Sequence, residues 1–261
     1  MGSALTKAYD IEKEPSMAGG IHGLWPVYRA KKKQQNMQEC SIFMFDKKAI
    51  KAPKTQAGID LLEIVKRDAT NLAKFKHPGV LNLVESPIED KAQIAFVTEP
   101  VTTNLAGLTM RGMELIPSEV EVKCMVLELM ECVNFLHSGA KHIHLNLAPE
   151  NLYLTKVGKL KVAGFNFIQP FQTASPVPVA LDFALRIGDF AMVPNLKFAA
   201  PEVTASPSEC SVQSDIFSIG CLIFFLMRLS KGKHPYFLLD QREQTNKQMH
   251  VNECLQVQAR L

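Results

Sequence analysis

The sequence predicts an α+β protein with a small, strand-rich first unit and a mainly helical second unit. Two observations carry this prediction. Short β-favouring runs flank one helical pattern in the first hundred residues, and apolar residues recur at helical spacing after Pro117. A hydrophobic content of 47% over 261 residues is enough for a sizeable core. A folded globular chain is therefore expected.

The first unit is predicted to be a small sheet with one long helix. The runs SIFMF (41–45) and QIAFVTEP (93–100) favour strands, and LLEIVKRDATNLAKF (61–75) between them has the spacing of a helix. The lysine run 31–33 lies in a polar stretch between apolar runs, which indicates a solvated hairpin turn. With a net charge of only +3, no nucleic-acid partner is expected.

The second unit is predicted to begin with a long helix at 120–142. Its apolar stripe comprises Val122, Met125, Val126, Leu129, Met130, Val133 and Leu136. Further on, the run IFSIGCLIFFLM (216–227) is twelve residues long, shorter than the roughly 20 that a membrane span needs. It predicts a buried helix.

The cysteines and the first residues indicate the cellular compartment expected for the chain. The six cysteines form no C-x-x-C pair and no Cys/His cluster with zinc spacing, so reduced thiols and no metal site are expected. No secretory signal opens the chain. The start MGSALT fits the N-myristoylation pattern at Gly2, the alternative being an ordinary start.

The stretch HIHLNLAPENLYL (142–154) keeps the frame of a phosphoryl-transfer loop. Protein kinases carry H-R-D-L-x-x-x-N there, with the Asp as base and the Asn as magnesium ligand. Here Asn146 stands at the Asp position and Asn151 at the Asn position. The frame is present without its base.

Neighbouring motifs follow in kinase order. They are KFKHPGVLNLVE (74–85), FVTEP at the hinge (96–100), Gly164-Phe165-Asn166 in place of Asp-Phe-Gly, an intact Ala200-Pro201-Glu202, and SDIFSIGCLIFFL (214–226). The chain resembles the protein kinase fold over residues 10–240. The resemblance implies two lobes, with an N-terminal extension at 1–9, an N-lobe at 10–99, a C-lobe at 100–240 and a partial helical segment at 241–261.

The segments FMFDKKAI (43–50) and NFLHSGAKHIHLNLAPENLYLTKVGKLKVAGFNF (134–167) are similar to the Scy-like pseudokinases, especially the coated-vesicle-associated kinase branch. In that family a kinase-like domain precedes helical repeats and acts in clathrin and endosome or Golgi trafficking. The resemblance also implies further helices after residue 240, so the C-lobe is expected to be incomplete at its C-terminus.

The resemblance assigns the catalytic positions, and most of them lack the required group. The degenerate positions are Phe43 for the phosphate-gripping lysine, Asp68 for the helix C glutamate, Asn146 for the base, Ala148 for the loop lysine and Gly164 for the magnesium-binding Asp. An amide has no useful proton affinity near neutral pH, and Asp68 is expected to lack its lysine partner. No catalytic residue and no metal ligand are therefore expected.

Nucleotide contacts, if any, would come from a reduced set of residues. AGGIHGLW supplies Gly20 and Gly23 of the glycine loop, and the hinge backbone at Glu99 and Val101 could still bind adenine. Asn151 is one neutral amide, a weak site for a hard cation, and it is expected to serve loop hydrogen bonding. Trp25 and Phe43 are expected to fill part of the cleft, the alternative being that Trp25 stacks on a ligand.

Three retained residues are expected to be structural. In the family His144 packs beneath the loop, Glu202 pairs with an arginine near the end of the domain, and Asp215 ties the loop backbone to the core helix. The loop is thus expected to persist as architecture after its chemistry has gone.

The sequence therefore predicts a catalytically inactive kinase-like interaction scaffold in vesicle trafficking. The alternative is a residually active or ATP-binding serine/threonine-type kinase, and a third reading is a general scaffold unrelated to membranes. No cofactor is expected, and any ATP binding should be weak and independent of magnesium. Expected partners are proteins such as clathrin or coat-adaptor components. The expected location is cytoplasmic, with peripheral association with vesicle, endosome or Golgi membranes.

Overall fold

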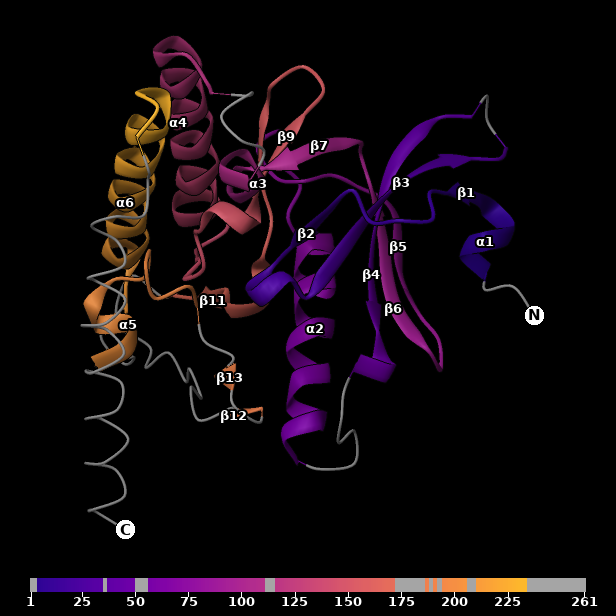
Figure 1. Ribbon diagram of the computed structural model, residues 1–261. Helices are drawn as coiled ribbons and strands as arrows, with labels where there is room; N and C mark the ends of the chain where they lie inside the picture. The colour runs from indigo at the N-terminus through magenta and orange to yellow at the C-terminus, as the bar shows by residue number, and fades with distance from the viewer. Residues whose placement is uncertain are drawn as a thin grey trace. The chain divides into compact units, whose positions relative to one another are not determined.

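The computed structural model describes residues 4–34, 37–49, 56–110, 116–171, 186–187, 190–191, 194–205 and 210–233 (Figure 1). The chain divides into two compact units. Unit 1 comprises Met1–Gly107 and Glu150–Asn166, and unit 2 comprises Leu108–Pro149 and Phe167–Leu261. This division differs from the predicted lobe boundary at residue 99, because the strands of residues 150–166 pair within unit 1. The predicted segment 241–261 lies outside the described residues.

Unit 1 is built on an antiparallel sheet in the order β1-β3-β4-β6-β5, with β2 also paired to β3. Phe43 lies in the middle of this sheet, opposite Val27 on one side and Phe96 on the other. The predicted strands at 41–45 and 93–100 are confirmed as β4 and β6. The strands are β1 (Tyr9–Ile11), β2 (Met17–Gly19), β3 (Trp25–Lys32), β4 (Glu39–Asp46), β5 (Leu83–Glu89) and β6 (Gln93–Thr98).

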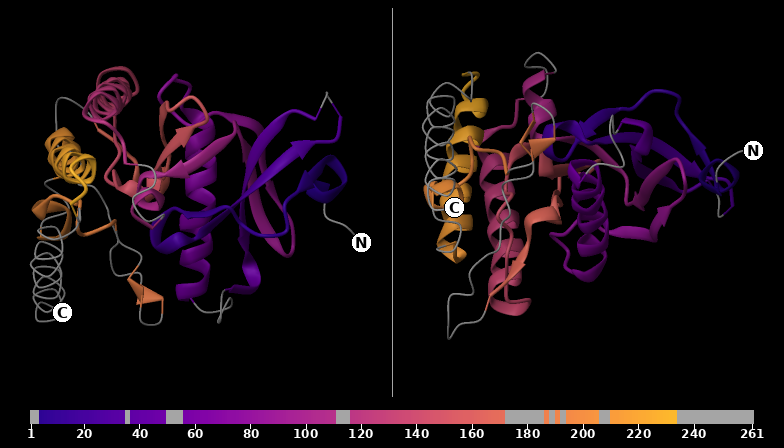
Figure 2. Two further views of the ribbon diagram at one scale, coloured as in Figure 1. Left: turned by 45° about the horizontal axis from the view of Figure 1, so that its top comes forward. Right: turned by 90° about the horizontal axis from the view of Figure 1, so that it is seen from below.

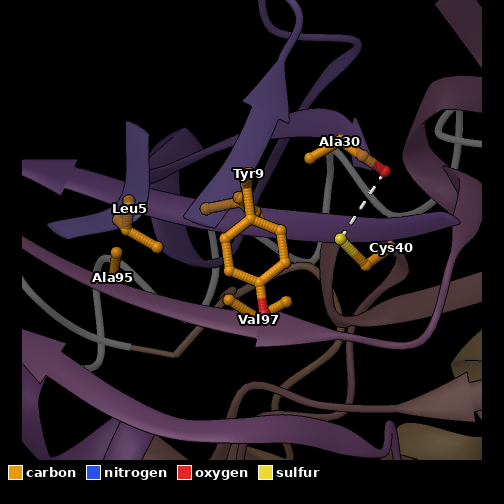
Figure 3. Close-up of a cluster of buried hydrophobic side chains, with 7 residues drawn as sticks. Leu5, Tyr9, Ala30, Cys40, Ala95 and Val97 are labelled. Atoms are coloured by element: carbon orange, nitrogen blue, oxygen red, sulfur yellow. Dashed lines mark hydrogen bonds between the residues drawn. The ribbon is translucent and has the colours of Figure 1, made fainter. Parts of the chain in front are cut away.

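Helix α2 (Gln56–Lys74) is the predicted long helix of this unit, and it packs against β5 and β6 (Figure 1). Its buried apolar residues include Ile64, Val65 and Leu72. A separate cluster is formed where α1 (Ala4–Ala8) and β1 meet the sheet, with Leu5 and Tyr9 only 1% and 2% exposed (Figure 3). The predicted N-terminal extension thus contributes Leu5 to a core of unit 1.

A second, three-stranded sheet completes unit 1 in the order β10-β9-β7. It joins β7 (Val101–Asn104), at the predicted hinge, to β9 (Leu152–Thr155) and β10 (Leu160–Val162). Because of this pairing, the hinge, Asn151 and Gly164 all belong to the same unit as the glycine-rich turn. The short helix α3 (Leu105–Met110) follows β7.

The described part of unit 2 contains two long helices that lie side by side, α4 (Glu119–Asn134) and α6 (Val212–Ser230) (Figures 1 and 2). Ser118 begins α4 with a capping box: its Oγ accepts a hydrogen bond from the Glu121 amide, and the Glu121 carboxylate accepts one from the Ser118 amide. The shorter elements are β8 (His142–Ile143), β11 (Gln169–Pro170), β12 (Arg186–Ile187), β13 (Phe190–Ala191) and α5 (Pro201–Ala205).

The predicted apolar stripe of α4 needs one correction. Met130 is 50% exposed, whereas Cys132 is buried in its place. At 3.6 residues per turn, Met130 lies about 100° around the helix from Leu129, which is fully buried. An apolar residue at that angle falls outside the packed face.

The predicted helix at 216–227 is confirmed as part of the longer α6, but it is only partly buried, since Ile216 is 56% exposed and Phe217 is 39% exposed. Helix α6 has 19 residues with a mean hydropathy of 1.6, so by length and composition alone it could cross a membrane. Half of its apolar window is buried within the protein, as in the core helix of a globular domain. Together with the antiparallel N-terminal sheet, these helices confirm the predicted α+β, kinase-like architecture.

Candidate nucleotide and catalytic site

The predicted site residues fall into both units. Gly20, Gly23, Phe43, Asp68, Glu99, Val101, Asn151 and Gly164 belong to unit 1, and His144, Asn146, Ala148, Glu202 and Asp215 belong to unit 2. Unit 1 therefore holds every predicted nucleotide contact, whereas unit 2 holds the catalytic loop. Each group is described within its own unit.

Phe43, at the position of the phosphate-gripping lysine, is part of an aromatic cluster in unit 1. Its ring is 1% exposed and stacks on Phe96 with centroids 4.7 Å apart and planes 13° apart. Tyr153 meets it edge-on at 5.3 Å, and Trp25 meets Phe96 edge-on at 4.8 Å. The position offers an apolar surface that is already covered by other rings.

Trp25 fills space, as expected, and it also makes a polar contact that the sequence did not predict. The side chain is 2% exposed, and its indole Nε1 donates a hydrogen bond to Oδ2 of Asp68 at 2.8 Å. A ring in this position is part of the core, which does not support the alternative that Trp25 stacks on a ligand.

Asp68 of α2 has two hydrogen-bond donors in place of a lysine. Besides Trp25, the backbone amide of Phe165 donates to Oδ1 at 2.7 Å. The resemblance implies a carboxylate without its lysine partner, and the structure adds a point that the sequence did not predict, namely that both oxygens accept hydrogen bonds. Burial raises the pKa of the Asp68 carboxyl to about 6, and the two hydrogen bonds oppose that shift.

Gly164, at the position of the magnesium-binding Asp, is closely packed against Asn151. Its φ is +81°, and a Cβ there would lie 2.3 Å from Cγ of Asn151. Asn151 is fully buried, and its backbone carbonyl accepts a hydrogen bond from the Ala163 amide at 2.9 Å. An aspartate at 164 would need both a left-handed backbone and displacement of the Asn151 side chain.

The glycine-rich turn packs closely on two aromatic side chains. A Cβ on Gly20 would lie 2.6 Å from Cδ1 of Trp25, and one on Gly19 would lie 2.0 Å from the Tyr153 hydroxyl. Gly23 ends the short 3-10 turn Ile21–Gly23. Gly19 and Gly20 allow the turn to approach the aromatic rings, a role that requires no phosphate.

The hinge groups that would read adenine already have partners in unit 1. The Val101 amide donates to Oγ of Ser41 at 3.0 Å, and the Glu99 carbonyl accepts from Oγ1 of Thr98 at 2.9 Å. Ser41 and Thr98 are 1% and 0% exposed. Sequence reasoning missed Ser41, although a hydroxyl at the start of the apolar run SIFMF was a signal that it bonds to something internal.

Two lysines near these positions are paired with glutamates. Lys47 pairs with Glu89 at 2.7 Å, and the largely buried Lys161 pairs with Glu99 at 3.0 Å. No group of three or more His, Cys, Asp or Glu residues that could hold a metal ion occurs in the described part of the chain.

In unit 2, Asp215 organises the backbone of the loop that resembles a kinase catalytic loop. Its carboxylate is fully buried and accepts hydrogen bonds from the amides of His144 and Leu145, at 2.7 and 2.8 Å. Nε2 of His137 lies 2.7 Å from Oδ2 of the same carboxylate. Leu145 has a φ of +60°, an unfavourable conformation for a residue with a side chain, so these bonds hold the loop in a strained form. This is the tie that the resemblance implied.

The other loop residues are buried. His144 is 0% exposed, and its Nδ1 accepts a hydrogen bond from the Asn146 amide at 3.2 Å. Asn146 and Ala148 are 2% and 1% exposed. A general base must come within hydrogen-bonding distance of the substrate hydroxyl, and the buried amide of Asn146 does not present itself to a substrate.

Glu202 has a different contact from the one implied by the resemblance. Its Oε1 accepts a hydrogen bond from Oγ of Ser214 at 2.6 Å, which joins α5 to the first turn of α6. The resemblance places the arginine partner on a helix further along the domain than the described residues. Within the described part of unit 2, Ser214 is the polar partner seen for this carboxylate.

Comparison with known proteins agrees with this geometry. The chain matches the protein kinase domain family over residues 26–260. It is 31% identical to SCY1-like protein 2 of Homo sapiens, over 93% of this chain and 27% of that protein. It is 31% identical to the protein kinase domain-containing protein ppk32 of Schizosaccharomyces pombe, over 86% of this chain and 32% of that protein.

A further relative is the protein kinase-like protein SCY1 of Saccharomyces cerevisiae, 26% identical over 86% of this chain and 31% of that protein. The chain thus spans about a third or less of the length of these relatives. The family match covers most of the chain, and two of these relatives carry SCY1 in their names. The chain therefore belongs to the protein kinase domain family and is Scy-like within it.

Proposed function

We propose that this chain is a kinase-like interaction module that has no phosphotransferase activity and serves vesicle trafficking through protein partners. The observation that carries the proposal is Phe43. At the position where a kinase grips the nucleotide phosphates, this chain has a buried ring stacked on Phe96.

Phosphoryl transfer depends on positioning and on neutralising charge, so the loss of several charged groups compounds. Asn146 replaces the base, Ala148 the loop lysine and Gly164 the metal-binding aspartate. In addition, the close contact between Gly164 and Asn151 leaves no room for a metal-binding side chain at position 164. Weak nucleotide binding without a gain from magnesium follows from the same set of positions.

The activity test is transfer of label from γ-labelled ATP with Mg²⁺ or Mn²⁺ to a generic protein substrate and to the chain itself. We expect no transfer above that of an Asn151→Ala variant whose fold is checked by circular dichroism. Transfer that follows the chain through purification and disappears in this variant would contradict the proposal.

The nucleotide test is the melting temperature of the chain with ATP, adenosine or neither, each with and without Mg²⁺. A ligand at 100 times its Kd stabilises the folded state by about 2.7 kcal/mol, so even moderate binding is visible. We expect little or no shift, and no difference on adding Mg²⁺. A shift that requires Mg²⁺ would favour an ATP-binding kinase instead.

The trafficking role is supported by the Scy-like resemblance. We expect a cytoplasmic protein that associates peripherally with vesicle, endosome or Golgi membranes by binding clathrin or coat-adaptor components. The test is binding of purified clathrin and purified adaptor complexes to the immobilised chain, with an active kinase domain at equal density as control. Equal binding to both surfaces would remove the support for this role and leave a scaffold unrelated to membranes.

A further inference from the structure

One buried carboxylate in unit 1 connects three segments that are far apart in the sequence. Asp68 of α2 accepts hydrogen bonds from the Trp25 indole at the start of β3 and from the Phe165 amide, at 2.8 and 2.7 Å. One turn further along α2, Nδ2 of Asn71 donates to the Phe165 carbonyl at 3.0 Å. Both polar groups of the Phe165 backbone are thus held by the same helix.

Hydrogen bonds are the stabilising contacts that the structure gives this carboxylate. Asp68 is 4% exposed. Its negative charge helps to raise the pKa of Tyr153 on β9. A buried carboxylate with no cation is stable only while its hydrogen bonds are made, because the lost hydration must be replaced. Each of the two donors is therefore held firmly in place.

The donor from Trp25 occupies the role that a lysine would have toward this helix. Phe43 on β4, the former lysine position, is opposite Val27 on β3, and Trp25 is two residues before Val27 on the same strand. A neutral indole N–H from the neighbouring strand thus donates a hydrogen bond to the helix. Phe43, at the position where a kinase has its lysine, packs against Phe96.

We propose that Asp68 is a positioning residue that locks α2, the glycine-rich turn and the segment 164–166 in one arrangement without any bound nucleotide or metal. Trp25 and Phe165 are the two groups that it holds. The lock goes beyond the proposed function, since it would exist in an active or an inactive protein.

The test uses the indole N–H resonance of Trp25, which is unambiguous because the chain contains one tryptophan. In the ¹⁵N-labelled full chain we expect this proton to exchange slowly with solvent. We expect Asp68→Leu to increase its exchange rate, and that of the Phe165 amide, by about tenfold or more, the factor that corresponds to a hydrogen bond to a charged group. Adding ATP and Mg²⁺ to the unaltered chain should change neither rate.

A second measurement separates the hydrogen bond from simple packing. The indole resonance of the unaltered chain should move between pH 4 and 8 as the Asp68 carboxyl titrates, and it should not move in Asp68→Asn. Phe96→Leu is the matched control, because Phe96 touches the Trp25 ring but makes no hydrogen bond to Asp68. This variant should lower stability and keep the pH-dependent movement.

Two results would overturn the proposal. One is an indole proton that exchanges equally fast in the unaltered chain and in Asp68→Leu. The other is an indole proton that exchanges with solvent as fast as that of an exposed tryptophan in the unaltered chain, a result that can be obtained even if Asp68→Leu does not fold.

Discussion

The contact between Gly164 and Asn151 gives a prediction that separates steric exclusion from backbone strain. Gly164→Ala places a Cβ 2.3 Å from Cγ of Asn151 at a φ of +81°. The matched control is Gly158→Ala, since Gly158 has a φ of +78° but has nothing within 4 Å of the added Cβ. The two substitutions share the conformational cost and differ in the collision.

The magnitudes follow from these two terms. A residue with a side chain in the left-handed region costs about 1–2 kcal/mol, which is the expected loss for Gly158→Ala. Overpacking a buried site adds about 1–3 kcal/mol, so Gly164→Ala should lose about 2–5 kcal/mol. In an Asn151→Ala background the collision is removed, and the cost of Gly164→Ala should fall to that of Gly158→Ala.

The assay is urea unfolding followed by the fluorescence of Trp25, which is buried in unit 1 and is the one tryptophan of the chain. Equal losses for the two glycine variants, or a cost of Gly164→Ala that is unchanged by Asn151→Ala, would refute the reasoning. The same collision means that Gly164→Asp is not a simple restoration of a magnesium ligand, because Asn151 must first move.

Three further predictions concern unit 1 and helix α4. Burial raises the folded-state pKa of Asp68 from 3.8 to about 6, so the contribution of this carboxyl to stability should be greatest below about pH 4 and fall by about 3 kcal/mol as the pH rises through 6. Urea unfolding of the unaltered chain and of Asp68→Asn across pH 4–8 checks this, because the difference in stability between the two should change with pH by about that amount. Phe43→Ala should cost about 3–5 kcal/mol by the same assay, because it removes the ring stacked on Phe96; a loss below 1 kcal/mol would contradict the packing role. Ser118→Ala should cost about 1 kcal/mol through loss of the α4 cap, seen as a lower circular-dichroism melting temperature, whereas Ser118→Asp should retain most of the stability.

The sequence by itself determined the fold class and which residue types stand at the kinase positions. The identities of Phe43, Asn146, Ala148 and Gly164 exclude a lysine, a carboxylate base and a metal ligand at those positions whatever the geometry, because charge and proton affinity belong to the side chain itself. Periodicity likewise predicted α2 and α4, because a helix of this length repeats its buried face every 3.6 residues, and the apolar run 216–227 predicted α6. It placed Met130 wrongly only because that residue lies at the edge of the apolar stripe.

Only the tertiary structure decided what replaced the missing groups. The hydrogen bond from Trp25 to Asp68 joins residues 43 positions apart, and that from Phe165 joins residues 97 apart. Local spacing carries no information on such pairs, since strand register and helix packing bring them together. Local spacing also does not predict the hydrogen bond from the Val101 amide to Ser41 or the close contact between Asn151 and Gly164. The sequence showed which residue types stand at the kinase positions, and long-range packing decided which side chains surround them.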